Sequence, residues 1–106
     1  MAITLGAVIF LATLAPRDEA VVAVVPDPPG VRLSGPTDRQ LILVDGKTVD
    51  GQTIDLSRSA RFRSMDPAVA TVDRDGFGRP VGDGRTTVVV EAERLSRSVD
   101  VVVEGA

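Results

Sequence analysis

The sequence contains no cysteine, no histidine, no tryptophan and no tyrosine. Without cysteine or histidine the chain has no thiolate nucleophile, no imidazole base and no site for covalent haem attachment, and it cannot form disulfides. The side chains that hold most structural zinc ions are absent too. We therefore expect no catalytic residues, no metal site and no cofactor, and the sequence predicts a protein that is not an enzyme.

Aromatic residues and positive charge are both scarce. Three phenylalanines are the only aromatic residues, and 12 basic residues face 15 acidic ones, which gives a net charge of −3. Proteins that bind nucleic acid usually need a basic surplus and rings on which bases can stack. Sugar-binding sites likewise tend to use Trp or Tyr. The composition therefore excludes nucleic acid as an expected partner and counts against a carbohydrate-binding module.

The first 15 residues are apolar apart from two threonines. They are too few for a membrane span of about 20 residues but match the hydrophobic region of a signal peptide. Ala15 and Ala23 both provide small residues for cleavage. We expect residues 1–23 to be a signal peptide or an uncleaved N-terminal anchor, with a misassigned start or a buried strand as the remaining alternatives. The protein is then exported to the periplasm, the cell surface or the medium.

Residues 24–30 read Val-Val-Pro-Asp-Pro-Pro-Gly. Proline fixes φ and removes a backbone donor, so the pattern is typical of an extended linker. The sequence predicts a linker over 24–30 and one folded domain over 31–106, because 106 residues leave no room for two cores.

Short segments rich in valine and threonine predict strands rather than helices. The final segment is the clearest, since valines fall on one face and polar residues on the other. Seven such segments separated by turn signals favour an all-β sandwich. The expected strands lie within 31–34, 40–44, 54–56, 61–64, 68–73, 86–92 and 95–104.

Four Asp-Gly pairs supply candidate turns, because glycine readily adopts the positive φ that tight hairpins require. They are Asp45-Gly46, Asp50-Gly51, Asp75-Gly76 and Asp83-Gly84. We also expect the strand over 99–103 to expose a free edge that a second sheet could extend.

The run Phe-Arg-Ser-Met-Asp-Pro-Ala-Val-Ala-Thr-Val-Asp at 62–73, followed by Gly76, Val81, Gly84 and Val88, resembles the group 2 bacterial immunoglobulin-like domain. The resemblance implies an immunoglobulin-like Greek-key sandwich. It also implies a non-catalytic structural or interaction module of the bacterial cell envelope or surface, of the spacer or adhesion type. Its partners would be other domains or proteins of the envelope.

Residues 40–58 are similar to the version of this domain found in large multidomain planctomycete envelope proteins. Gly78 and Pro80 depart from the family pattern, and since both weaken a strand we expect residues 79–81 to be irregular or at a sheet edge. The resemblance and the alternation together predict the following inward-facing residues: Leu56, Phe62, Ala70, Val72, Val88, Val90, Val99 and Val101.

Two polar runs resemble ligand loops. The run Asp73-Arg74-Asp75-Gly76 is similar to the start of a calcium loop, but the bidentate Glu of such a loop is replaced by Gly84. The run 82–87 is similar to a phosphate loop, but it lacks the required spacing and precedes a strand. We interpret both as turns.

Arg58, Arg61 and Arg63 form the one local concentration of positive charge. Arg61 and Arg63 should share the face opposite Phe62, where they could contact an anionic polysaccharide or another domain. A solvated outer face paired with aspartates is the simpler interpretation. A structural or interaction module, a carbohydrate- or envelope-polymer-binding module and a fragment of a larger exported protein thus all remain open.

Overall fold

The computed structural model describes residues 20–106, and most of the expected signal or anchor segment lies outside them. Residues 20–106 contain no helix, and hence none that could cross a membrane. The described chain forms ten strands, which are β1 (Val21–Asp27), β2 (Gly30–Ser34), β3 (Gln40–Leu41), β4 (Leu43–Thr48), β5 (Thr53–Asp55), β6 (Arg61–Ser64), β7 (Ala70–Val72), β8 (Phe77–Pro80), β9 (Gly84–Ala92) and β10 (Leu95–Glu104).

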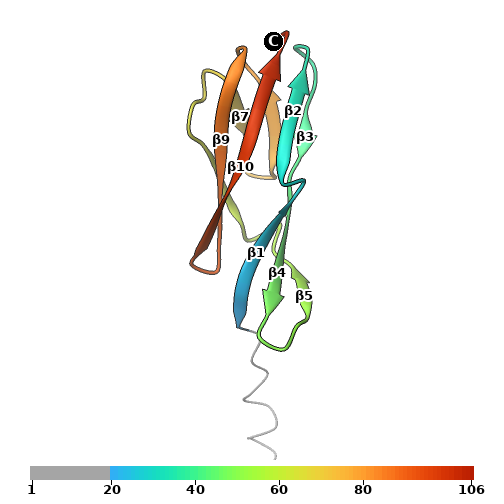
Figure 1. Cartoon of the computed structure of the whole chain (residues 1–106), viewed down its shortest axis with the longest axis vertical. Coiled ribbons are helices and arrows are strands. Elements are labelled where there is room, and N and C mark those ends of the chain that lie inside the picture. The colour runs from blue at the N-terminus through green and yellow to red at the C-terminus, as the bar shows by residue number, and fades with distance from the viewer. Residues whose placement is uncertain (1–19) are drawn as a thin grey trace, which may run out of the picture.

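The strands form an all-β sandwich, as predicted (Figure 1). A four-stranded sheet of order β2-β10-β9-β6 makes one layer. Two three-stranded sheets, β1-β4-β5 and β3-β8-β7, make the other. In Figure 1 the β1-β4-β5 sheet occupies the lower part of the domain and the β3-β8-β7 sheet the upper part.

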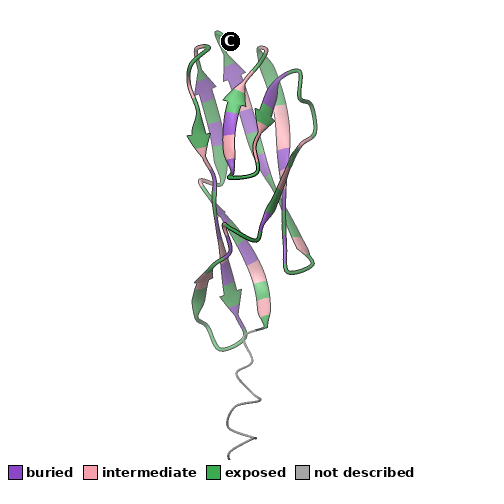
Figure 2. Ribbon diagram, turned by 180° about the vertical axis from the view of Figure 1, so that it is seen from behind, coloured by how far each residue is buried: buried purple, intermediate pink, exposed green. Residues whose placement is uncertain are grey.

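The core lies between these layers and is built almost entirely from valine, leucine, isoleucine and alanine (Figure 2). Six of the eight residues predicted to face inward are buried, while Phe62 and Val72 are partly buried and pack against the same cluster. Alternation along β10 is especially regular, with Val99, Val101 and Val103 at most 2% exposed. Apolar burial is the main favourable term in folding, so this β-branched core stabilises the sandwich.

The segment 24–30 is part of the fold, and its interpretation as a linker is wrong. β1 pairs antiparallel with β4, and Val24 is only 1% exposed. The chain then changes layer, and β2 pairs in parallel with β10. Proline is tolerated here because β1 is an edge strand, where a missing donor costs no ladder bond. The folded unit therefore includes β1 and does not begin at Val31, and cleavage after Ala23 would cut through β1.

The apolar run 40–44 forms two strands instead of one. Ile42 separates β3 from β4, is completely buried, and donates a 2.9 Å hydrogen bond from its amide to the carbonyl oxygen of Gly76. Leu41 and Leu43 on either side remain partly exposed. At this point the chain passes from the β3-β8-β7 sheet to the β1-β4-β5 sheet.

The Asp-Gly pairs divide into two kinds. Gly51 and Gly76 have φ values of 87° and 96° at turns, as predicted, and Gly84, which begins β9 directly after the bend at Asp83, has a φ of 143°. Gly46, by contrast, lies inside β4, where a Cβ would lie 2.6 Å from Cδ1 of Leu56. The expected turn at Asp45-Gly46 is therefore wrong, because this glycine permits close packing against a side chain.

The β9–β10 hairpin has no glycine in its turn. Ala92 pairs with Leu95, so the connection contains only Glu93 and Arg94. Their φ values are 53° and 68°. Two successive residues with positive φ are the pattern of a two-residue hairpin turn, which glycine and asparagine usually occupy.

Of two predictions about strand edges, one is confirmed and one is wrong. Gly78 pairs with both β3 and β7, but Arg79 and Pro80 pair with β7 alone and Val81 lies outside the strand, so residues 79–81 are at a sheet edge or irregular, as predicted. Pro80 ends the strand, and the amides of Val81 and Gly82 then bond to the carbonyl oxygen of Val69. The strand over 99–103 has no free edge over most of its length, since β9 pairs with it on one side and β2 on the other from Asp100 onward.

Candidate functional site

The structure places two of the three candidate arginines together. Arg61 and Arg63 are exposed on β6, on the face opposite Phe62, as predicted. They lie across from Glu91 and Val89 of β9. Arg58 belongs to the loop between β5 and β6 and lines a different groove. The three arginines therefore do not form one site.

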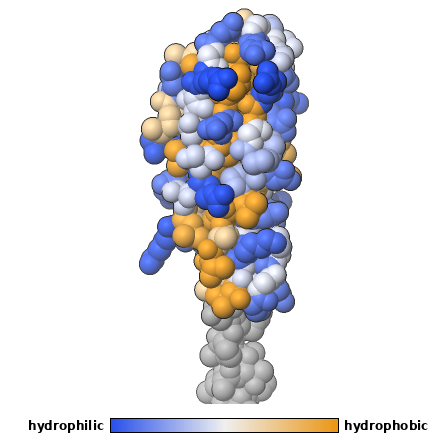
Figure 3. Space-filling view, in the orientation of Figure 1, coloured by the Kyte–Doolittle hydropathy of each residue, from blue (hydrophilic) through white to orange (hydrophobic). Residues whose placement is uncertain are grey.

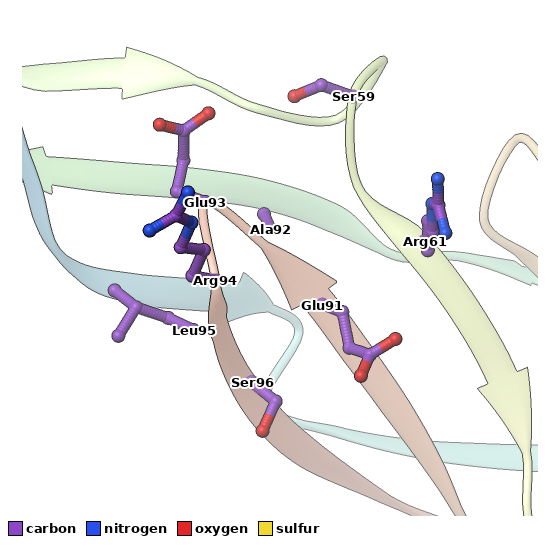
Figure 4. A pocket seen from close by; sticks show the side chains of 8 residues that line it. All are labelled: Ser59, Arg61, Glu91, Ala92, Glu93, Arg94, Leu95 and Ser96. Carbon is purple, nitrogen blue, oxygen red and sulfur yellow. The ribbon is translucent and has the colours of Figure 1, made fainter.

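Arg61 lines an open pocket of about 320 Å³ beside the β9–β10 turn (Figure 4). Glu91, Glu93 and Arg94 line the same pocket. Two guanidinium groups thus face two carboxylates, so the pocket has no surplus of positive charge. In Figure 4 the labelled side chains come from the β9–β10 hairpin and from β6 and the loop before it, and they do not converge on one point, which is typical of a solvated outer face.

The run Asp73-Arg74-Asp75-Gly76 is a turn, as predicted. Oδ1 of Asp73 accepts backbone hydrogen bonds from Asp75 at 2.9 Å and from Phe77 at 3.0 Å. Oδ2 accepts from Nη1 of Arg79 at 3.1 Å. The Phe77 amide is the main reason that the pKa of Asp73 is lowered, with Asp75 and Arg79 adding to it. The carboxylate is thus already occupied within its own loop.

The polar and glycine residues of the loop before β9 are also engaged in contacts within the protein. Oδ1 of Asp83 accepts a 2.8 Å hydrogen bond from the amide of Ala106. A Cβ at Gly82 would lie 2.7 Å from the carbonyl oxygen of Ala68, so this glycine is held against backbone. Among residues 20–106 there is no cluster of three or more carboxylate, histidine or cysteine side chains that could hold a metal ion.

The Ser-Met-Asp-Pro run that carries much of the family resemblance builds a loop. Oγ of Ser64 donates to the carbonyl oxygen of Ala70 at 2.7 Å and accepts from the amide of Asp66 at 3.3 Å. Oδ1 of Asp66 accepts from the amide of Ala68 at 3.1 Å. Side-chain oxygens that bond to nearby amides in this way fix turns. These motif residues therefore shape the backbone between β6 and β7.

Sequence reasoning missed a second groove, of about 480 Å³, which we call the Leu43 groove. Its lining residues come from three segments that are separate in the sequence. They are Leu41, Leu43, Ser57, Arg58, Arg74, Asp75 and Phe77. The sequence gives one hint of this groove, the apolar run 40–44. Because successive side chains of a strand point to opposite faces, some of these apolar residues must lie on the outer face.

Hydrogen bonds fix the walls of the Leu43 groove. Oγ of Ser57 accepts from the amide of Val44 at 2.9 Å, which ties the β5–β6 loop to β4. The amide of Ser57 in turn donates to Oδ1 of Asp55 at 2.9 Å and lowers the pKa of that carboxyl. On the other wall, the Ile42–Gly76 hydrogen bond holds the β7–β8 turn. Hydrogen bonds from backbone amides to side-chain and backbone oxygens therefore hold both walls of the groove in place.

Exposed valines gather at the opposite end of the molecule from the C-terminus. Val22 and Val25 of β1 are 60% and 39% exposed, and Val49 after β4 is 63% exposed. Figure 3 shows hydrophobic surface over β1 at this end. The amide of Val49 bonds to the carbonyl oxygen of Ala20, so Val49 lies beside the point where the described chain begins.

Two solved structures of the S-layer protein SbsC are similar to this chain. Domains 5–6 match with a TM-score of 0.68 and 18% identity over 82% of this chain and 45% of theirs. Domains 4 and 5 match with a TM-score of 0.70 and 19% identity over 84% of this chain and 54% of theirs. The chain shares their β-sandwich fold. It spans about half the length of each of these solved chains. No protein-family model and no curated protein matches the chain.

Proposed function

We propose that this protein is a non-catalytic structural and interaction module of the bacterial cell envelope or surface, of the group 2 immunoglobulin-like type. The observation that carries the proposal is the similarity in fold to domains of an S-layer protein. The motif over 62–73, which builds the β6–β7 loop, supports the finer assignment to the group 2 domains.

The placement of the two ends of the described chain suits a spacer. β1 begins at one end of the elongated sandwich, and the C-terminus lies at the other (Figure 1). The segment that follows β1 pairs in parallel with the last strand over five residue pairs, from Gly30 with Asp100 to Ser34 with Glu104. A pull on both ends loads these pairs together in shear, because parallel strands that are drawn in opposite directions slide past one another.

Several polar side chains in the loops are already hydrogen-bonded to the backbone, which supports a non-catalytic role. The carboxylates of Asp66 and Asp73 and the hydroxyl of Ser64 all serve backbone hydrogen bonds within loops. No buried side-chain nitrogen or oxygen within residues 20–106 lacks a partner. An active site usually holds polar groups aimed at a substrate position, and this arrangement does not favour one.

An accessibility experiment on intact cells tests the proposal. An antibody against residues 20–106 is added to intact cells, to cells with a permeabilised outer layer and to lysates, with a cytoplasmic protein as control. We expect labelling before lysis, under conditions in which the control stays unlabelled. Labelling of both proteins only after lysis would contradict an envelope location.

The alternative of a polymer-binding module based on Arg58, Arg61 and Arg63 finds less support. Arg58 is separated from the other two, and Arg61 faces Glu91 across the strand pair. An anionic polymer would need a continuous row of unpaired cations to gain affinity. We therefore propose no ligand for this trio.

A further inference from the structure

The Leu43 groove combines exposed apolar side chains with a concave shape. Leu43 is 46% exposed, although its neighbour Ile42 is fully buried. Leu41 and Phe77 also line the groove and are only partly buried. Single exposed apolar residues are ordinary on protein surfaces, but these three line one hollow, and we call them its apolar floor.

Arginine side chains surround this floor. Arg58 and Arg74 line the groove from opposite loops. The guanidinium carbon of Arg39 lies 5.1 Å from the centre of the Phe77 ring, so a third cation lies beside the groove. Each of the three comes from a different loop, which explains why no run of basic residues marks the site in the sequence.

These guanidinium groups are not neutralised by close ion pairs. Within residues 20–106 the ion pairs closer than 4 Å are Arg32 with Glu104 and Arg79 with Asp73. Asp75 is the one carboxylate that lines the groove, and Asp55, outside the lining, interacts electrostatically with Arg58 while it also accepts from the amide of Ser57. Two lining arginines thus face one lining carboxylate, with Arg39 beside the groove, although the whole chain carries a net charge of −3.

We propose that the Leu43 groove binds an acidic peptide segment of a partner protein, with a hydrophobic side chain on the apolar floor and flanking carboxylates on Arg58 and Arg74. Guanidinium groups bind carboxylates in a bidentate geometry, and the apolar floor adds affinity through buried area. The inference rests on the proposed role as an interaction module and gives that role a location.

Other occupants fit the groove less well. Sugar rings usually stack on Trp or Tyr, and the chain contains neither residue. A lipid bilayer presents a broad surface to a protein, whereas these apolar side chains line a hollow of about 480 Å³. The hydrophobic anchor and charged flanks of a peptide match the observed combination of floor and rim.

Nuclear magnetic resonance tests the proposal with the ¹⁵N-labelled full chain. The probe is an acetylated, amidated pentapeptide, Glu-Leu-Asp-Phe-Glu. One control peptide has lysine in place of each acidic residue, and another has serine in place of leucine and phenylalanine. We expect saturable shifts at the amides of Leu41, Leu43 and Phe77 with the probe alone. Equal responses to the lysine peptide, or shifts centred elsewhere, would overturn the proposal.

Two double charge-reversal variants test whether the peptide binds at this groove or elsewhere on the surface. Arg58→Glu with Arg74→Glu should weaken peptide binding at least tenfold, about 1.4 kcal/mol. Arg61→Glu with Arg63→Glu, on the outer face of β6, should leave the affinity unchanged. If the first variant does not give a folded spectrum, Arg58→Gln with Arg74→Gln takes its place. Weaker binding in the β6 variant alone would show that the site is wrong.

Three further titrations distinguish the remaining occupants. Phosphatidylglycerol vesicles, the acidic polysaccharide alginate and increasing concentrations of the chain itself are each followed at the same amides. We expect none of them to give saturable shifts at Leu41 and Leu43. A response to any of them in place of the peptide would overturn the proposal. Because these measurements use purified protein, failure here would leave the result of surface labelling unaffected.

Discussion

Ser64 closes the β6–β7 loop by donating a 2.7 Å hydrogen bond from Oγ to the carbonyl oxygen of Ala70. The same oxygen accepts from the amide of Asp66. One hydroxyl thus serves both ends of the loop, and it is partly buried. Its removal leaves a carbonyl and an amide without their partner.

Ser64→Ala should therefore lower the free energy of unfolding by about 1–2 kcal/mol. Urea denaturation of the full chain measures the change. Ser96→Ala is the matched control, because Ser96 is exposed and should stay within about 0.5 kcal/mol of the wild type. Equal effects of the two substitutions would show that the loop does not depend on this hydroxyl.

Gly76 and Gly51 form a natural pair for separating backbone strain from steric overlap. Both have positive φ, 96° and 87°. A Cβ at Gly76 would lie 2.7 Å from the carbonyl oxygen of Ile42 and 3.0 Å from Cζ of Phe62, whereas a Cβ at Gly51 would meet nothing within 4 Å. Gly51→Ala should cost about 1–2 kcal/mol from strain alone.

Gly76→Ala should cost about 1–3 kcal/mol more than Gly51→Ala, because it adds overpacking to the same strain. Chemical denaturation of both variants gives the difference directly. The prediction fails if the two alanine variants are equally stable, since the overlap at Gly76 would then be relieved without cost.

The β9–β10 turn offers a route to a more stable protein. Glu93 and Arg94 hold positive φ without the freedom of glycine. Replacing them by asparagine and glycine should stabilise the domain by about 1 kcal/mol, because that pair suits a two-residue hairpin turn. For a domain of this size the melting temperature should rise by about 4–8 °C. An unchanged or lower melting temperature would contradict the assigned turn geometry.

Stability should decrease in acid. The pKa of Asp73 is lowered chiefly by the Phe77 amide, that of Asp55 by the Ser57 amide and that of Asp50 by the Thr48 hydroxyl. The unfolded chain therefore binds protons before the folded chain does. The stabilising contribution is complete above the ordinary aspartate pKa of about 4 and is lost as the pH falls below it toward the lowered pKa values.

Thermal melts between pH 7 and pH 2 should show a steady loss of stability below about pH 4. Asp73→Asn keeps an oxygen for the Phe77 amide but loses the charge paired with Arg79. It should melt below the wild type at pH 7, and the gap should close in acid. A gap that stays constant across this range would show that Asp73 contributes nothing to the acid sensitivity.

Alternation in the sequence predicted the strands that have one buried and one exposed face. The segments over 61–64 and 95–104 match β6 and β10, since Phe62 packs against the core and every second residue from Val99 to Val103 is buried. β1 was missed because its prolines were interpreted as a linker signal, whereas they mark the change from one sheet to the other. A pattern confined to one segment does not reveal which strand that segment will pair with.

The limits of local patterns also explain which surface features could be predicted from the sequence. Arg61 and Arg63 could be placed together because they are two residues apart on one strand. The Leu43 groove could not be predicted, because residues near 42, 58 and 75 meet only when two sheets and two loops are in place. Contacts between distant segments depend on tertiary packing, which local periodicity does not encode.

The parallel pairing of β2 with β10 also governs when the domain can be completed. Val31 pairs with Val101, so this ladder joins residues 70 positions apart. A chain that emerges from a ribosome or a secretion channel with its N-terminus first must hold β2 unpaired until β10 has appeared. Such long-range pairing slows folding. The larger sheet is therefore assembled only after β10 has been delivered, and the portion that emerges before it can stay extended until then.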